Sequence, residues 1–301
     1  MKKEQPTYCG YVAIIGRPNV GKSTLLNRIL GEKISITSHK PQTTRHQILG
    51  IKTEGGKQTV YVDTPGLHKN IKRAINRYMN RAALQTLAEV DVIIWVLEGM
   101  RWLDEDEWIY KRLKDIKKPI ILLVNKVDQI KAKTDLLPYL QRLSEKADFV
   151  QIMPVSAEKG INIAELEALV AELLPESPHY FAEDQLTDRN DRFLAAEMIR
   201  EKLMRRLNQE IPYALTVEIN EFKEKENILH IYATIWVEKE NQKAIVIGAG
   251  GQNLKNIGKL ARLDMEKLFD SKVFLQLWVK VKENWSDDEK ALRSFGYKEN
   301  K

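Results

Sequence analysis

The chain has 301 residues, of which 43% are hydrophobic, and a formal net charge of +6 at pH 7. This composition supplies enough apolar material for one or two packed domains and excludes a disordered chain. The single cysteine, Cys9, excludes an intramolecular disulfide framework and a cysteine zinc cluster. The longest apolar run is too short to cross a bilayer, and the N-terminus lacks the apolar core of a signal peptide. We therefore expect a cytoplasmic protein, with peripheral membrane contact left open.

The positive charge is unevenly distributed. Residues 182–301 contain 21 basic and 21 acidic residues, so the whole excess lies in residues 1–181. A basic chain suggests a nucleic-acid partner only weakly. An RNA site in the second half would therefore be a local patch and not a generally basic domain.

Strand and helix patterns alternate in the first part. Apolar runs at residues 11–16, 59–63, 90–99, 119–125 and 150–156 predict strands. Helical spacing is found at residues 22–30, 104–116, 135–147 and 163–174. Strands this apolar are covered on both faces, so we expect an α/β domain over residues 1–176, with a mostly parallel, doubly wound, six-stranded sheet.

The second part has a different organisation. Pro175 and Pro178 interrupt the pattern and indicate a linker, which we place at residues 177–190. Residues 191–301 then read as α-β-β-α-α-β, with a helix at 193–207, strands at 213–222 and 228–237, a helix at 252–269 and a strand at 273–281. The order predicts a small α+β domain.

A phosphate-binding loop is predicted at residues 16–23. GRPNVGKS follows a strand, opens a helix and matches G-x-x-x-x-G-K-[ST]. Backbone N–H groups of such a loop form a nest for phosphates, Lys22 adds a charge and the Ser23 hydroxyl suits Mg²⁺. Asp63, in VDTPG, ends the next suitable strand and is a second oxygen ligand for Mg²⁺.

The base is specified by NKVD. The Asp128 carboxylate can accept two hydrogen bonds from guanine, whereas adenine offers no such pair of donors. SAEKG follows a later strand, where the Ala157 N–H can reach guanine O6. The residues assigned to GTP or GDP are Gly16, Arg17, Pro18, Asn19, Val20, Gly21, Lys22, Ser23, Thr24, Asp63, Thr64, Pro65, Gly66, Leu67, Asn125, Lys126, Asp128, Ser156, Ala157 and Glu158.

Hydrolysis is less completely specified. The spacing favours Thr44 over Thr43 as a third Mg²⁺ ligand, beside Ser23 and Asp63. Leu67 stands where many small GTPases have a glutamine that orients water. Asn19 either coordinates an activating K⁺ or only bonds its own loop. The catalytic set is Lys22, Thr44, Gly66 and Asn19.

The chain resembles the Era GTPase family, almost from end to end. The resemblance rests on GRPNVGKSTLLN, ISITSHKPQTTRHQILGI, VDTPGLH, NKVD, SAEKG, REKLMRRL, VIGAGGQNLKNIG and LQLWVKVK followed by ENWSDDE. It implies a C-terminal type II KH domain, binding to the 3′ end of 16S ribosomal RNA, a role in 30S subunit maturation and loose inner-membrane association. We also expect a monomer.

The glycine stretch near the C-terminus is the candidate RNA contact. A glycine loop before a helix lets RNA phosphates approach the backbone. The loop offers no charge, because Ala249 and Gly250 occupy its tip. Taken one by one, its apolar residues are better explained as core. The residues assigned to RNA are Ile247, Gly248, Ala249, Gly250, Gly251, Leu254, Lys255, Lys259 and Arg262.

Two other classes of protein compete with an RNA-binding GTP switch. An RNA-modification GTPase would be expected to carry a further catalytic cysteine or cofactor domain, and Cys9 is a poor candidate. A membrane-trafficking GTPase is disfavoured because neither end carries a lipidation signal.

Overall fold

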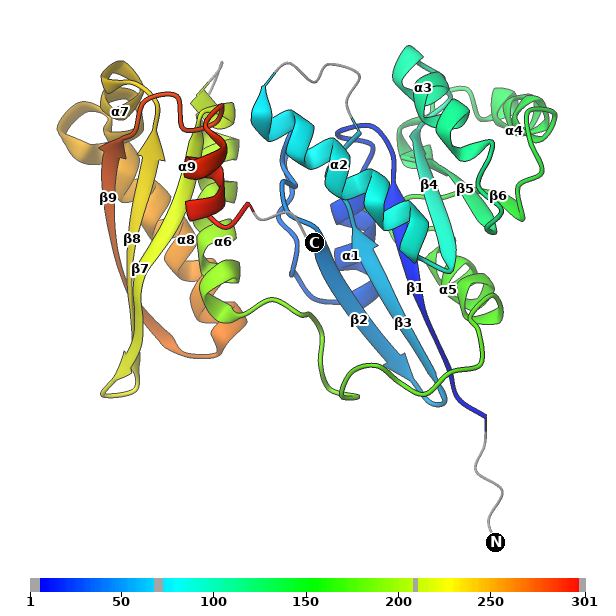
Figure 1. Ribbon diagram of the computed structural model, residues 1–301, viewed down its shortest axis with the longest axis horizontal. Helices are drawn as coiled ribbons and strands as arrows, with labels where there is room; N and C mark the ends of the chain where they lie inside the picture. The colour runs from blue at the N-terminus through cyan, green and yellow to red at the C-terminus, as the bar shows by residue number, and fades with distance from the viewer. Residues whose placement is uncertain (1–5, 68–72, 208–210, 298–301) are drawn as a thin grey trace, which may run out of the picture. The chain divides into compact units, whose positions relative to one another are not determined.

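The computed structural model describes residues 6–67, 73–207 and 211–297. The chain forms two compact units (Figure 1). The first consists of Met1–Ser35, Thr44–Ile71 and Met79–Asp188, and the second of Ile36–Thr43, Lys72–Tyr78 and Arg189–Lys301. The segment 36–43, which joins two elements of the first unit in sequence, thus belongs to the second unit.

The first unit is built on a six-stranded sheet in the order β2-β3-β1-β4-β5-β6. Only β2 runs antiparallel to its neighbour, β3, so the predicted mostly parallel sheet is confirmed. The strands are β1 (Tyr8–Ile15), β2 (Ile48–Glu54), β3 (Lys57–Asp63), β4 (Val92–Glu98), β5 (Ile120–Asn125) and β6 (Gln151–Pro154). Sequence analysis assigned no range to β2, because its mixed residues carry only a partial apolar pattern, with Ile48 and Ile51 buried.

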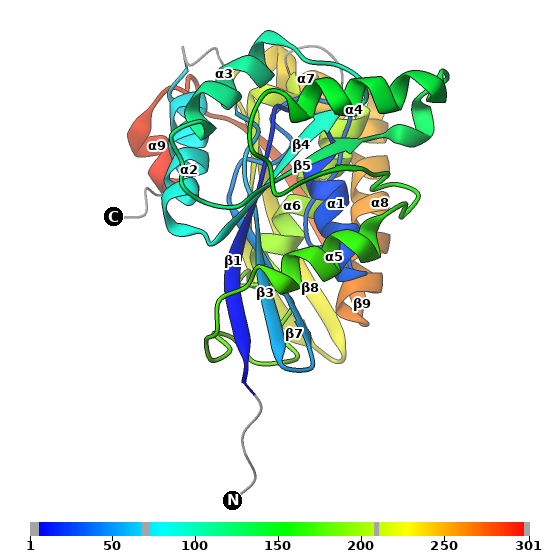
Figure 2. The ribbon, with the colours of Figure 1, turned by 90° about the vertical axis from the view of Figure 1, so that its right-hand side faces the viewer.

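Helices cover both faces of this sheet. Helices α2, α3 and α4 contribute to one buried cluster with the central strands, around Trp95, whereas α1 and α5 lie side by side (Figure 2). The helices are α1 (Lys22–Leu30), α2 (Ala74–Glu89), α3 (Asp104–Leu113), α4 (Leu136–Ser144) and α5 (Ile163–Glu172). The predicted bounds of α1 are confirmed, and α3 to α5 are shorter than predicted by one to three residues at some ends. Parallel strands place their carboxyl ends, and the motifs that follow them, at one edge.

The second unit packs helices against one face of a three-stranded sheet, in the order β7-β8-β9 (Figure 1). Its elements are α6 (Asp191–Arg206), β7 (Leu215–Lys225), β8 (Ile228–Val237), α7 (Glu240–Ile247), α8 (Gln252–Phe269), β9 (Lys272–Val281) and α9 (Glu289–Ser294). The predicted order is confirmed. Strand β7 runs on to Lys225, three residues beyond its predicted end at residue 222, and α9 was not predicted.

The connection between the units runs along the first sheet. The Cys9 N–H donates to the Pro175 carbonyl, and the Ile51 N–H donates to the Leu186 carbonyl. The Gln58 side chain accepts from the N–H groups of Tyr180 and Phe181. The compact first unit therefore extends through Asp188. No helix within the described ranges is long and apolar enough to cross a membrane.

Candidate functional site

The predicted phosphate loop, residues 16–23, joins β1 to α1. Gly21 has φ 105°, and a Cβ there would lie 2.3 Å from the Asn125 Nδ2 atom. Asn125, which ends β5, donates to the Val20 carbonyl at 2.7 Å and accepts from the Ala157 N–H at 3.0 Å. One side chain therefore holds three of the predicted motifs together, and only glycine leaves it room.

Lys22 lies inside the loop and is almost fully buried. Its Nζ donates to the carbonyls of Gly16 and Arg17, at 3.1 and 3.0 Å. Burial lowers the pKa of Lys22 from 10.5 to about 8, against the attraction of Asp63. The loop therefore keeps a desolvated ammonium where phosphates are expected, and this strengthens its interaction with an anion.

A cluster of oxygen atoms surrounds Asp63 at the end of β3. The Oδ2 atom accepts from the hydroxyls of Ser23 and Ser35, at 2.7 and 2.9 Å, and the Thr44 hydroxyl lies 2.8 Å from that of Ser23. The other carboxylate oxygen, Oδ1, is buried and has no hydrogen-bond partner among the residues that the structure describes. Burial raises the pKa of Asp63, so a cation here would relieve an unfavourable buried charge. Hard oxygen ligands of this kind suit Mg²⁺.

Thr43 points elsewhere. Its hydroxyl donates to the Lys40 carbonyl at 2.6 Å and to the Ser38 hydroxyl at 3.1 Å. The geometry thus supports Thr44, not Thr43, as the threonine beside Asp63. No group of three His, Cys, Asp or Glu residues in the described ranges could hold a metal, so the candidate site depends on the hydroxyls.

The predicted base-binding motifs also meet. The Ser156 hydroxyl donates to Asp128 Oδ1 at 2.5 Å, which orients the carboxylate. Lys126 has φ 64°, and its ammonium lies 2.6 Å from Glu98. Glu98 also pairs with Arg17 at 3.1 Å. Although burial raises the pKa of Glu98, Lys126 and Arg17 lower it below its usual value.

Sequence analysis missed four residues of this region. Glu98 joins the phosphate loop to the base motif, and the buried Asp106 accepts from Arg17 Nε at 3.1 Å. Ser35 belongs to the oxygen cluster, and Arg28 donates to the carbonyls of Ala157 and Glu158. The position of Glu98, a carboxylate at the carboxyl end of a buried strand, was the one available signal.

The segment after Asp63 closes against the phosphate loop. The Thr64 hydroxyl donates to the Ile14 carbonyl at 2.9 Å, and a Cβ on Gly66 would lie 2.9 Å from the Pro18 ring. Leu67 is buried, and its N–H donates to the Gly16 carbonyl at 3.3 Å. Residues 68–72, which follow Leu67, lie outside the described residues. The apolar character of Leu67 leaves water orientation to another group.

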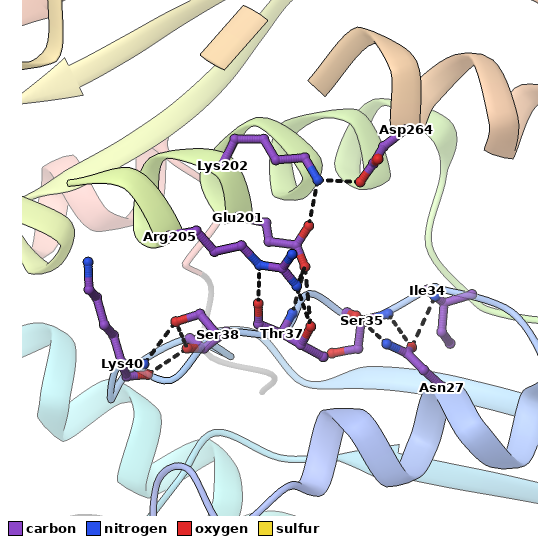
Figure 3. Close-up of polar contacts among 11 residues, drawn as sticks. Asn27, Ile34, Ser35, Thr37, Ser38, Lys40, Glu201, Lys202, Arg205 and Asp264 are labelled. Atoms are coloured by element: carbon purple, nitrogen blue, oxygen red, sulfur yellow. Dashed lines mark hydrogen bonds and ion pairs between the residues drawn. The ribbon is translucent and has the colours of Figure 1, made fainter. Parts of the chain in front are cut away.

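The segment 36–43 is bound to helix α6 within the second unit (Figure 3). Glu201, fully buried, accepts from the Thr37 N–H at 3.0 Å and pairs with Lys202 and Arg205. Lys202 also pairs with Asp264 of α8, and Arg200 donates to the Thr43 carbonyl. Arg200 and Lys202 are both buried in ion pairs, so this part of α6 is not a solvated face.

The glycine loop of the second unit lies between α7 and α8. Gly248, Gly250 and Gly251 all have positive φ, and a Cβ on Gly250 or Gly251 would meet no atom within 4 Å. Ala249 is exposed at the tip. The space above the loop is thus open, as backbone contact with a phosphate requires.

The residues predicted beside this loop divide into two groups. Ile257 is buried in the core and Leu254 packs against it, which confirms the core interpretation for these two residues, whereas Ile247 is half-buried. Lys255 and Lys259 are exposed, whereas Arg262 pairs with Glu266 at 2.5 Å. Sequence analysis missed Arg206 of α6, an exposed residue that donates to the Asn253 side chain, itself bonded to the Ile245 carbonyl at 3.1 Å. The Arg206 side chain therefore places a positive charge beside the loop, which contains no charged residue itself.

Comparison with known domains agrees with this organisation. Residues 11–126 match a family described as a 50S ribosome-binding GTPase, and residues 210–286 match the KH domain. The fold and the two sites thus define a P-loop GTPase with a C-terminal KH domain.

Sequence identity to known proteins shows which family of this class the chain belongs to. The chain is 60% identical to GTPase Era of Pseudomonas aeruginosa over 289 residues, covering 96% of this chain and 95% of that protein. It is 58% identical to GTPase Era of Pseudomonas putida over 297 residues, covering 99% of both. The chain belongs to the Era GTPase family.

Two solved structures are similar over nearly their whole length. One is Era in complex with MgGDPNP and nucleotides 1506–1542 of 16S ribosomal RNA, with a TM-score of 0.93, 42% identity, and coverage of 97% of this chain and 99% of that chain. The other is an Aquifex aeolicus Era variant bound to GDP and AlF4⁻, with a TM-score of 0.94, 41% identity and the same coverage.

Proposed function

We propose that this chain binds GTP with Mg²⁺, hydrolyses it to GDP and phosphate, and so controls the binding of its KH domain to the 3′ end of 16S ribosomal RNA in 30S subunit biogenesis. The relatives bound to a GTP analogue with RNA and to GDP with AlF4⁻ support the parts of this proposal that concern nucleotide binding, hydrolysis and RNA binding. The proposed domains are residues 1–176 for GTP, 177–190 as linker and 191–301 for RNA.

One observation carries the proposal. Thr44 belongs to the oxygen cluster around Asp63, while the residue before it, Thr43, is bonded through its carbonyl to the buried Arg200 of α6. The segment 36–43 is therefore continuous in sequence with the nucleotide site and fixed to the RNA-binding unit. A change at Thr44 is passed through the chain to Thr43 and from there through a hydrogen bond to α6, and nucleotide switches use connected segments of this kind.

The residues of the first unit have separable roles in this proposal. The N–H groups of the phosphate loop and Lys22 hold the phosphates, and Asp128, oriented by Ser156, selects guanine. Ser23, Thr44 and Asp63 would hold Mg²⁺, which neutralises phosphate charge when bound. Lys22 stabilises the charge that develops on the phosphate oxygens, because its buried ammonium needs no reorganisation.

Water must be oriented without a glutamine, since Leu67 is apolar and buried. We assign the role of the missing glutamine to Asn19 and to a K⁺ ion held by its side-chain oxygen. The φ of 65° places Asn19 in the left-handed region of the loop. Turnover in K⁺ should exceed turnover in Na⁺ at equal ionic strength. Equal rates in the two salts would remove K⁺ from the proposal and leave Mg²⁺ alone.

The test of the switch is RNA binding in two nucleotide states. Filter binding is measured for GTP-loaded and GDP-loaded protein on a 16S 3′-end oligonucleotide and on a scrambled one. The GTP form should bind the true sequence more tightly than the scrambled one. If it shows no preference, the proposed function is wrong.

The variant Glu201→Gln tests the path through segment 36–43. It keeps an acceptor for the Thr37 N–H but removes the buried charge that pairs with Lys202 and Arg205. We expect the ratio of GTP-state to GDP-state RNA affinity to fall several-fold, with GTP binding retained, because hydrogen bonds to charged groups contribute about 1.5–3 kcal/mol. Glu240→Gln is the matched control, because it neutralises an exposed acidic partner of Lys243 in the same unit. An unchanged ratio in Glu201→Gln would exclude this path.

Assembly and location complete the proposal. We assign the chain to the cytoplasm as a monomer that acts on the 30S subunit, with peripheral inner-membrane association. Sedimentation with 30S subunits and flotation with anionic vesicles, each with GTP and with GDP, test the two partners separately.

A further inference from the structure

The three-stranded sheet of the second unit has two unlike faces. Its inner face, with Ile231, Ala233 and Ile235 of β8, is buried against α6 and α8. Its outer face carries aromatic rings along β8 and β9, at His230, Tyr232, Trp236, Phe274 and Trp278. We call this outer surface the aromatic face. It is separated by the sheet from α8, whose first residue follows the glycine loop.

Four rings of the aromatic face, those of His230, Phe274, Tyr232 and Trp278, form a continuous array. The Tyr232 ring stacks on that of Trp278, with centroids 5.9 Å apart and an interplanar angle of 17°. Phe274 lies edge-on to Tyr232 at 5.9 Å and contacts His230 at 5.2 Å. Phe274 and Trp278 are nonetheless 45% and 40% exposed. Cross-strand aromatic pairs stabilise a sheet, but rings left this open also offer surface to a partner.

Helix α9 and the residues around it cover only one end of this face. The Phe295 ring lies 5.9 Å from that of Trp236, and the Tyr297 hydroxyl lies 3.4 Å from that of Thr216. The opposite end, with Tyr232, Phe274 and Trp278, lacks such a cover among the described residues.

The charges along the two strands identify the partner. The outward positions of β9 are Lys272, Phe274, Gln276, Trp278 and Lys280, so a lysine stands at each end of this row, and Lys282 follows the strand. No carboxylate occupies an outward position of β8 or β9 in their described lengths. On the neighbouring strand β7, Glu218 accepts from the Trp236 ring N–H, and Glu221, opposite Tyr232, is paired with Lys223. The Lys280 ammonium lies 5.8 Å from the centre of the Trp236 ring, so cation and ring share one surface.

We propose that the aromatic face is a second binding surface for single-stranded RNA, in addition to the glycine loop. Bases stack on Tyr232, Phe274 and Trp278, and the lysines at either end of this row neutralise phosphates. Stacking needs only the π-face that every base has, so the surface accepts many sequences. The proposal rests on the RNA-binding function proposed above, and it extends the footprint of this unit beyond the loop.

Photocrosslinking locates the RNA. The probe is an oligouridylate of about 12 nucleotides that contains 4-thiouridine, a length within the range that a single stacking surface can hold. We expect cross-links to peptides of β8 and β9 in the full-length protein. Tyr232→Ala and Trp278→Ala should each weaken binding of the probe about 5- to 150-fold, because stacking on one aromatic residue contributes about 1–3 kcal/mol.

Three further variants make the result decisive. Trp278→Phe keeps a ring and should restore most of the affinity, which a loss of folding in Trp278→Ala would not explain. Lys280→Gln should weaken binding and reduce its dependence on salt. Leu263→Ala, which removes an exposed apolar side chain from α8, should have no effect.

The outcomes separate this proposal from the proposed function. If Gly251→Asp removes all binding and cross-linking while the Trp278 variants leave both unchanged, RNA binds at the glycine loop alone and the aromatic face is no RNA site. If the wild-type protein binds neither this probe nor the 16S 3′-end oligonucleotide, both proposals fail. If anionic vesicles quench tryptophan fluorescence through Trp278 and the probe does not, the surface binds lipid, and this proposal is wrong.

Discussion

Two glycine-rich loops of this protein precede a helix, and both are candidate phosphate sites. The loop at residues 16–23 is enclosed, because a Cβ on Gly16, Gly21 or Gly66 would lie within 3 Å of neighbouring atoms. The loop at residues 248–251 is open at its tip, since a Cβ on Gly250 or Gly251 would meet no atom within 4 Å, although one on Gly248 would lie 2.6 Å from Asn253. The first loop holds a buried ammonium from Lys22, whereas the second contains no charge.

The difference follows from the two partners. A nucleotide is a small, highly charged ligand, so its site benefits from a desolvated cation and walls that fix each phosphate. An RNA strand passes through its site and must be able to leave, so backbone N–H groups and peripheral cations suffice. The same local motif therefore gives a rigid nucleotide site in one unit and an open surface in the other.

The largest expected effect is the loss of nucleotide affinity when a methyl group is added to Gly21 of the enclosed loop. In Gly21→Ala the new Cβ displaces Asn125, which loses its bonds to Val20 and Ala157, and the loop must also change its φ of 105°. We expect nucleotide affinity to fall about 100-fold or more, from lost hydrogen bonds and backbone strain together. Fluorescent GDP titration measures the change.

Gly250→Ala is the matched control for that prediction. It meets no neighbouring atom, so it should cost only about 1 kcal/mol of unfolding free energy, through its φ of 57°, and should leave nucleotide affinity unchanged. Equal losses of nucleotide affinity in the two variants would contradict the distinction between an enclosed and an open loop.

A smaller effect is expected from pH, and only at the enclosed loop. In the nucleotide-free protein the pKa of Lys22 is lowered to about 8, and bound phosphates would raise it. Above pH 8 the complex then holds a proton that the free protein has lost, so affinity falls as pH rises. We expect a loss of up to about tenfold between pH 8 and 9 and little change between pH 6 and 7.

GDP binding measured calorimetrically in buffers of different ionisation enthalpy would show this proton uptake. RNA binding to the nucleotide-free protein over the same range provides the comparison, because the open loop contains no such group. A flat GDP affinity between pH 8 and 9 would mean that Lys22 stays protonated in the free protein.

The smallest effect is expected at the open loop. Arg206 donates to Asn253, directly beside Gly248, and supplies charge that the loop lacks. Arg206→Ala should weaken binding of the 16S 3′-end oligonucleotide a few-fold. The slope of log K against log salt should decrease by about 0.7, as for one lost phosphate contact on a single strand. Arg293→Ala, which removes an exposed arginine on α9, is the control. A variant with an unchanged slope would show that Arg206 only orients Asn253.

The sequence by itself determined the parts of this protein whose chemistry lies in contiguous residues. Lys22, Ser23, Asp63, Asn125 and Asp128 could be predicted as site residues because phosphate, magnesium and guanine each require particular groups at fixed spacing after a strand. The mostly parallel sheet and the α-β-β-α-α-β order followed from apolar periodicity, which is a local property. Strand β2 and helices α2 and α9 were not predicted from these local patterns.

Only the tertiary structure decided which distant residues support those motifs. Glu98 joins Arg17 to Lys126, Ser35 reaches Asp63, and Arg206 reaches Asn253. The tertiary structure also brings residues 36–43 against α6, where the buried Glu201 accepts a hydrogen bond from Thr37. A surface-type residue such as glutamate or arginine carries no local signal of its partner. Its role is set by the burial and charge of residues far away in the sequence, and these exist only once the chain has folded.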